Sequence, residues 1–105
     1  MITVNYSEHG EERHFSCIGH SGYNVGNDIV CAAVSALCGA LAATLFINED
    51  SFEALTVAEG EGECVILCEG SAAAPYFSLV LNGLYAIADA YPFNLRVTGH
   101  KRDDS

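Results

Sequence analysis

The chain has 105 residues and half of them are hydrophobic, so it is long enough for one folded domain and leaves little room for two. Its 14 acidic against 4 basic side chains give a formal net charge of −10, which argues against a surface for nucleic acid or anionic lipid. The acidic residues are spread along the chain, so the charge indicates a solvated acidic surface that attracts basic partners.

The chain opens with two predicted strands joined by a polar hairpin. Apolar residues alternate in MITVNY, and a second strand, HFSCIGH, ends near Gly19. Between them SEHGEER is polar and contains a glycine, so we expect it to form the turn. The loop GYNVGN then leads into a long helix from Asp28 to about Ile47, which Asn48-Glu49-Asp50 closes.

Two further strands and a second helix follow. FEALTVAE and GECVILCE are predicted strands on either side of an acidic, glycine-containing turn. In the second helix Pro75 suits the first turn and Tyr91-Pro92 ends it. FNLRV is a candidate for a short final strand, and residues 98–105 are expected to form a frayed tail. The order ββαββα(β) indicates a single α+β domain over residues 1–105, an antiparallel sheet packed with two helices. The second helix has these apolar residues at helical spacing: Phe77, Val80, Leu81, Leu84 and Ala88.

The first helix invites a membrane interpretation, because the 19 residues from Ile29 to Ile47 contain no charge. Six of them are alanines, however, and neither flank carries a nearby Lys or Arg that would anchor a cytoplasmic end. We therefore expect no membrane span. A helix that is apolar on nearly every face is buried on several sides, by a sheet and by a second subunit.

The five cysteines indicate a cytoplasmic protein with reduced thiols. Their number is odd, no CxxC pair occurs, and MITVNYSEHG lacks the basic start and long apolar core of a signal peptide. Most of them are expected to be small buried hydrophobes. Cys64 and Cys68 share one strand face but lie too far apart for an easy disulfide, and their spacing is not that of a zinc site. We predict no metal and no cofactor.

The stretch GHSGYNVGNDIVCAAVSAL, residues 19–37, places reactive residues around the start of the long helix. Asp28 is a good N-cap, which puts Cys31 in the first turn, where free N–H groups and the helix dipole stabilise a thiolate. His20 stands where the second strand gives way to the loop, and a loop that folds back brings its imidazole to Cys31. Gly22 and Gly26 permit loop conformations that let backbone approach a peptide, and Ser35 lies one turn beyond Cys31 on the same helical face.

Each of these residues also has a purely structural interpretation. A cysteine in a helix is commonly packing, a histidine at a strand end is commonly a boundary residue, and Asp28 caps the helix in either case. Ser35 can bond back to a helix carbonyl. Of the other histidines, His9 is predicted to be a turn residue, and His14, on the same strand face as His20, is a candidate neighbour in the site.

The same stretch resembles the signature of the ribosomal-processing cysteine protease family, Prp. That signature joins a Gly-His-Ala/Ser pair, a glycine-containing loop and Asp-Ile-Val-Cys-Ala-Ala-Val-Ser, and here residues 28–35 read DIVCAAVS without departure. The resemblance implies that Cys31 and His20 are catalytic, that Asp28 and Ser35 match the family's aspartate and serine, and that residues 22–27 cover the site as a mobile loop. Two departures are a loop about one residue shorter and Ser21 in place of alanine.

The resemblance also implies a substrate and an assembly. Family members are dimeric α+β proteins that remove an N-terminal extension from large-subunit ribosomal protein number twenty-seven, typically after an aromatic residue. We accordingly expect a homodimer whose substrate is this basic protein. The alternatives are a non-catalytic dimeric ribosome-assembly factor that binds a basic ribosomal protein, and a redox enzyme that uses Cys31.

The expected mechanism follows from the helix-start position of Cys31. Its thiolate attacks the scissile carbonyl, the oxyanion forms near the N–H groups at the helix start, and His20 protonates the departing amine. A backbone carbonyl or Asp28 orients His20, and the sequence does not decide between them. The loop is expected to be mobile without ligand and ordered with a bound peptide.

Overall fold

Two tight hairpins build the sheet of this protein, whose computed structural model describes residues 1–24 and 28–99. In the first hairpin only Gly10 and Glu11 lie between the strands, and Gly10 has the positive φ (+64°) that such a turn requires. The polar turn expected over residues 7–13 is therefore wrong in extent, because its residues pair as strands up to His9 and from Glu12 onward. His9 is a strand residue and not a turn residue.

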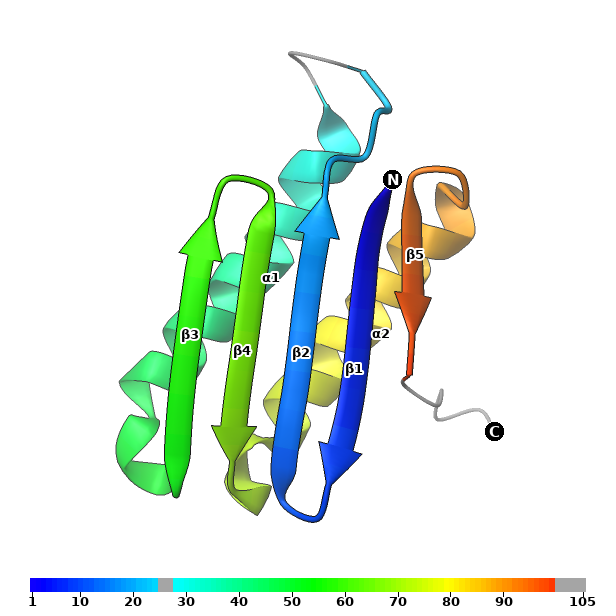
Figure 1. Ribbon diagram of the computed structural model, residues 1–105. Coiled ribbons are helices and arrows are strands. Elements are labelled where there is room, and N and C mark those ends of the chain that lie inside the picture. Colours follow the sequence, from blue (N-terminus) through cyan, green and yellow to red (C-terminus); the bar gives the residue numbers. More distant parts are fainter. Residues whose placement is uncertain (25–27, 100–105) are drawn as a thin grey trace.

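The elements follow the predicted order, and the final strand is present (Figure 1). Two short 3-10 turns, η1 and η2, lie after the first helix and before the second. Thr98 belongs to the last strand, so the expected tail does not begin at residue 98, and residues 100–105 lie outside the described part of the chain. The bounds are β1 Ile2–His9, β2 Glu12–Gly19, α1 Ile29–Ile47, η1 Glu49–Ser51, β3 Ala54–Gly60, β4 Glu63–Glu69, η2 Ser71–Ala73, α2 Ala74–Ala90 and β5 Leu95–Thr98.

The five strands form one sheet in the order β3-β4-β2-β1-β5. The first four pair antiparallel, as expected, whereas β5 pairs parallel with β1. The reason is that α2 returns the chain to the end of the sheet where β1 begins (Figure 1), so the next strand must run alongside β1. The α+β fold class is confirmed, with a sheet that is antiparallel except at this edge.

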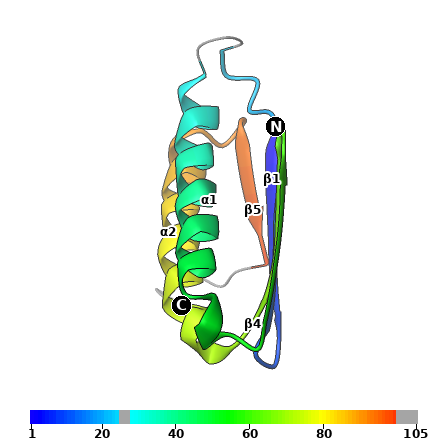
Figure 2. The ribbon, with the colours of Figure 1, turned by 90° about the vertical axis from the view of Figure 1, so that its left-hand side faces the viewer.

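Both helices cover the same face of the sheet, and among the described residues no helix lies on the other face (Figure 2). The strands alternate accordingly: Val4, Phe15 and Ile66 are buried under the helices, while their neighbours in sequence are more exposed. The helices contribute Leu41, Leu45 and the buried stripe of α2 to the same core. That stripe consists of Phe77, Val80, Leu81 and Leu84, four of the five residues predicted for it.

The two helices pack closely because Gly83 of α2 has no side chain. A Cβ there would lie 3.1 Å from Leu37 Cδ1 of α1, so even a methyl group would require the Leu37 side chain to shift. By length and hydropathy alone both helices could cross a membrane. In this structure they lie along the sheet and contribute buried residues to its core (Figure 2).

Candidate active site

Cys31 lies in the first turn of α1, where the sequence places it. Asp28 is the N-cap, and its Oδ1 accepts a hydrogen bond of 2.9 Å from the Cys31 amide. Cys31 is the one cysteine of the five that is not buried. Its sulfur lies at the N-terminal end of a 19-residue helix, beside the positive end of the helix dipole.

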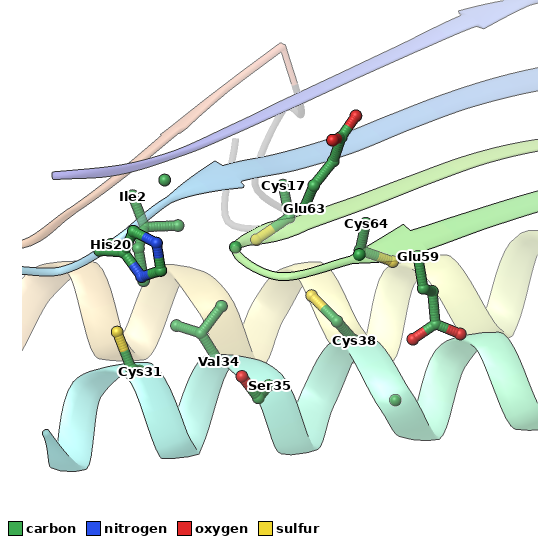
Figure 3. Close-up of a pocket in the computed structure, with 14 residues that line it drawn as sticks. Ile2, Cys17, His20, Cys31, Val34, Ser35, Cys38, Glu59, Glu63 and Cys64 are labelled. Carbon is green, nitrogen blue, oxygen red and sulfur yellow. The ribbon is translucent and has the colours of Figure 1, made fainter. Parts of the chain in front are cut away.

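His20 faces Cys31 from the end of β2. Gly19, the last residue of that strand, has φ +115°, so the chain turns out of the sheet directly before the histidine. Figure 3 shows the Cys31 sulfur pointing from α1 toward the imidazole ring. The structure thus brings together the two residues predicted to be catalytic, at the mouth of one cavity of about 230 Å³.

The cavity runs from this pair between the sheet and α1 (Figure 3). Ser35 lines it one turn beyond Cys31, as predicted, and its proposed contact with a substrate stays a prediction. The remaining walls are apolar or acidic, so the site suits a peptide with apolar and basic groups. The other lining side chains are those of Ile2, Cys17, Val34, Cys38, Cys64, Glu59 and Glu63.

The β3–β4 turn packs against the His20 ring, a contact that the sequence did not reveal. Gly62 has φ +68°, and a Cβ on it would lie 2.9 Å from His20 Nε2. The Gly62 carbonyl also accepts a hydrogen bond of 2.8 Å from the Gly19 amide. The imidazole therefore rests against a bare backbone. No local pattern marks Gly62, because its role depends on a contact between residues more than forty positions apart.

Asp28 does not orient His20, because its contacts in the described part of the chain go elsewhere. Its Oδ2 accepts a short hydrogen bond from the Ser21 hydroxyl and a longer one of 3.2 Å from the Tyr23 amide. The bond from Ser21, followed by the one from the Cys31 amide, lowers the pKa of Asp28 to about 2. Ser21, which follows the catalytic histidine, is thus a partner of the helix cap.

The expectation that His14 is a neighbour in the site is wrong. His14 lies on the face of the sheet that the helices leave uncovered, where it contacts Glu12 and the ring of His9. Because the chain turns at Gly19, His20 leaves the alternation of β2 and joins the helix-covered side.

The glycine loop is described only in part. Gly22 has φ +69°, and a Cβ added to it would have no other atom within 4 Å, so backbone conformation rather than space favours glycine there. It does not line the cavity with Cys31. Gly26 and the rest of residues 25–27 lie outside the described residues, and the expected mobility of the loop stays a prediction.

Three further cysteines meet deeper in the cavity, between the sheet and α1 (Figure 3). Cys17 and Cys64 are direct partners across β2 and β4, and hydrogen bonds to both, followed by burial, raise the pKa of Cys38. All three are buried free thiols, as expected. In residues 1–24 and 28–99 no group of three or more His, Cys, Asp or Glu side chains is arranged to hold a metal ion.

A thiol at a helix start, faced by an imidazole at the mouth of a peptide-sized cavity, defines a cysteine peptidase site. The comparisons agree with this class. A family model described as cysteine protease Prp matches residues 1–96, so the chain belongs to this family and is a cysteine protease. The resemblance seen in residues 28–35 is thereby confirmed. A comparison with curated proteins finds no match.

Solved structures with the same fold include the ribosomal processing protease Prp from S. aureus with a covalently linked product peptide. That structure has a TM-score of 0.82 and 24% identity, over 95% of this chain and 100% of the other. The same S. aureus protein with a substrate peptide gives 0.74 and 22%, over 95% and 100%. SMU.848 from Streptococcus mutans gives 0.70 and 24%, over 93% and 92%. At these identities the likeness shows the fold.

Proposed function

We propose that this cysteine protease is a cytoplasmic endopeptidase that removes the N-terminal extension of large-subunit ribosomal protein number twenty-seven, and that it acts as a homodimer. The observation that carries the proposal is the Cys31–His20 pair at the mouth of the cavity, within the residues that the family model matches. The S. aureus relative, described as an essential ribosomal processing protease, supports the choice of a ribosomal substrate.

The side chains of Cys31 and His20 are sufficient for every step of peptide-bond hydrolysis. The Cys31 thiolate forms a C–S bond to the scissile carbonyl carbon while the carbonyl π electrons move onto oxygen. When this intermediate collapses, the C–N bond breaks and His20 gives its proton to the leaving amine. His20 then takes a proton from water as the water oxygen attacks the thioester, which releases the acid and restores the thiolate.

The charge of the molecule suits a basic substrate. Ribosomal proteins bind RNA phosphates and are rich in Lys and Arg, whereas this chain has a net charge of −10. Glu59 and Glu63 both line the cavity, and the Glu59 carboxylate points toward α1 (Figure 3). Opposite charges at the site and on the substrate speed the encounter and favour one orientation of the peptide.

Cleavage of a peptide that spans the extension, with an aromatic residue before the scissile bond, tests the proposal. Cys31→Ala should abolish cleavage, and Cys31→Ser should be almost as inactive because a hydroxyl is not ionised at this position. His20→Ala should lose about 10²- to 10⁴-fold in kcat. Cys68→Ala is the matched control, because this thiol is buried in the core and does not line the cavity.

Turnover by either Cys31 variant would sink the proposal. A wild-type protein that binds the ribosomal protein without cutting it would favour the non-catalytic assembly factor. A redox enzyme would need a second thiol that reaches Cys31. The nearest cysteine along α1 is Cys38, which lies seven residues away and is hydrogen-bonded to two other thiols.

A further inference from the structure

Two of the N–H groups at the start of α1 already have partners. The Cys31 amide donates to the Asp28 carboxylate (2.9 Å), and the Ala32 amide donates to the Asp28 carbonyl (3.0 Å). An amide that donates to a carboxylate is poorly available to a second anion. These two amides are therefore poorly available to the oxyanion, and the expectation that it forms near the N–H groups of the helix start stays a prediction.

A different amide already points at the reacting sulfur. The backbone N–H of Ser21 donates to Cys31 Sγ at an N···S distance of 3.3 Å. In the tetrahedral intermediate the oxyanion is borne by the carbon bonded to this sulfur, so a donor at the sulfur lies within reach of the oxyanion. Ser21 is only 2% exposed, which keeps water from competing for the bond.

Ser21 is fixed at its other polar groups as well. Its carbonyl accepts a hydrogen bond of 3.0 Å from Asn94 Nδ2, and its hydroxyl is bonded to the Asp28 carboxylate. The direction of the Ser21 amide is thus set before substrate binds, which is the condition for electrostatic stabilisation of a transition state.

Asn94 is itself held firmly by its main chain. Its amide donates to the Tyr91 carbonyl at the end of α2 (3.0 Å), and its carbonyl accepts from the Ile2 amide at the start of β1 (2.9 Å). The Asn94 side chain therefore connects Ser21 to two elements of the core. A serine beside the catalytic histidine is anchored by a residue 73 positions away in sequence.

We infer that the Ser21 amide donates to the Cys31 thiolate in the resting enzyme and to the oxyanion in the transition state, and that Asn94 is the positioning residue that aims it. This inference rests on the peptidase activity but not on the identity of the substrate. As the C–S bond forms, negative charge moves from sulfur to the carbonyl oxygen. The hydrogen bond from the Ser21 N–H then passes from the sulfur to this oxygen, which lies beside it. His20 remains the proton donor for the leaving amine.

Asn94→Asp and Asn94→Ala test the inference. The first replaces the donor by a carboxylate of the same shape, and the second removes it without adding charge. Both should lower kcat by about tenfold to hundredfold with little change in KM. The Ser21 N–H is still present in these variants but is no longer aimed at the oxyanion, so the loss should be smaller than if the N–H were removed. Asn48→Asp is the control, because Asn48 makes the same kind of bond, to the Thr44 carbonyl (2.8 Å), at the far end of α1. It should leave kcat unchanged.

Two readouts separate positioning from a general loss of structure. The pH profile of Cys31 alkylation by iodoacetamide should move to higher pH in both Asn94 variants, because the thiolate loses part of a donor. Inhibition by a peptide aldehyde, which forms a tetrahedral adduct, should weaken as much as kcat, while binding of the uncut peptide in a Cys31→Ala background should not. Wild-type protein that cuts no peptide would overturn the function, whereas the alkylation profile would still test the donor.

Unchanged kcat and an unchanged alkylation profile in folded Asn94 variants would overturn the inference, as would equal losses of kcat and peptide binding. If the variants do not fold, the amide can be removed directly. Cys17 and Cys31 flank Ser21 and serve as ligation junctions for a synthetic 17–30 segment that carries an ester in place of the Ser21 amide. This protein should lose about 10²- to 10³-fold in kcat against the same semisynthetic protein with the amide, and an equal kcat would refute the assignment.

Discussion

Gly62 contributes to the site by having no side chain. A Cβ on Gly62 would lie only 2.9 Å from His20 Nε2, so we expect the position of the proton donor to depend on a glycine in a turn between two other strands. Gly62 also has a positive φ, which most other residues adopt only with strain. The backbone strain of a substitution and its clash with His20 can be separated. Gly10, in the first hairpin, also has a positive φ, but no side chain lies near it.

Gly62→Ala should lower kcat/KM by at least about tenfold, since its Cβ would lie 2.9 Å from His20 Nε2 and displace the imidazole. Gly10→Ala is the matched control. Gly10 has nearly the same φ (+64°) and nothing within 4 Å of the added Cβ, so this variant should lose stability but keep its activity. Peptide cleavage and thermal unfolding of both variants check the prediction. Equal activity of the two would show that His20 does not depend on this contact.

Cys31 should react with iodoacetamide faster than any other cysteine in the native protein at neutral pH. It is the one thiol of the five that is not buried, and it lies at the positive end of α1. Burial raises the pKa of the Cys68 thiol and leaves it protonated as well as inaccessible. Mass spectrometry of the alkylated native protein gives the order of labelling. Earlier labelling of a buried cysteine would contradict the assignment of the nucleophile.

The first turn of α1 is the element on which the site depends most. The Asp28 carboxylate caps the helix and also accepts hydrogen bonds from Ser21 and from the start of the loop. One carboxylate thus connects the two segments that lie beside Cys31. These bonds favour the ionised carboxyl, and they lower the pKa of Asp28 from 3.8 to about 2. The integrity of this turn should therefore depend on pH in the acid range.

Asp28→Asn should destabilise the protein at neutral pH, and the difference from wild type should shrink as the pH falls from about 4 to about 2. A lowered pKa in the folded state means stability that is present above 3.8 and is lost as the pH falls through 2, and the amide cannot titrate. Urea unfolding at a series of pH values measures the difference. Asp50→Asn, in η1, controls for the loss of one negative charge. A difference that stays constant down to pH 2 would rule out the carboxylate as the cause.

Elements with a strong local pattern were predictable, and contacts between distant segments were not. The uncharged run and the Asp28 cap predicted a helix from Asp28 to about Ile47, and α1 is observed from Ile29 to Ile47 with Asp28 as its N-cap. The ends of β1 and β2 at the first hairpin were not predicted, because their residues are charged or polar. These ends are held by cross-strand pairing and not by a buried apolar face. Likewise Cys31 and His20 could be identified from one short motif, whereas Gly62 and Asn94 act across 42 and 73 positions of sequence on residues of that motif.

At the scale of the whole molecule, the helix layer is less well covered than the face of the sheet that it packs on. The helices bury one face of the sheet, but their own outer faces carry large apolar side chains that nothing in the described part of the chain covers. Phe46 is 65% exposed and Ile47 80% exposed at the end of α1, and Leu79 of α2 is 72% exposed. Exposed apolar side chains gathered on one face are typical of an interaction surface.

We therefore predict a stable homodimer with α1 at its interface, because Ile29, Phe46 and Ile47 give this helix more exposed apolar side chain than α2 has. Light scattering at micromolar concentration should give twice the mass of the chain, 11.1 kDa. Phe46→Glu should shift the protein to the monomer, because a buried carboxylate without a partner opposes association. Leu79→Glu places the same charge on the exposed face of α2 and should leave the dimer intact. A monomeric wild type would refute the prediction, and dissociation by Leu79→Glu alone would move the interface to α2.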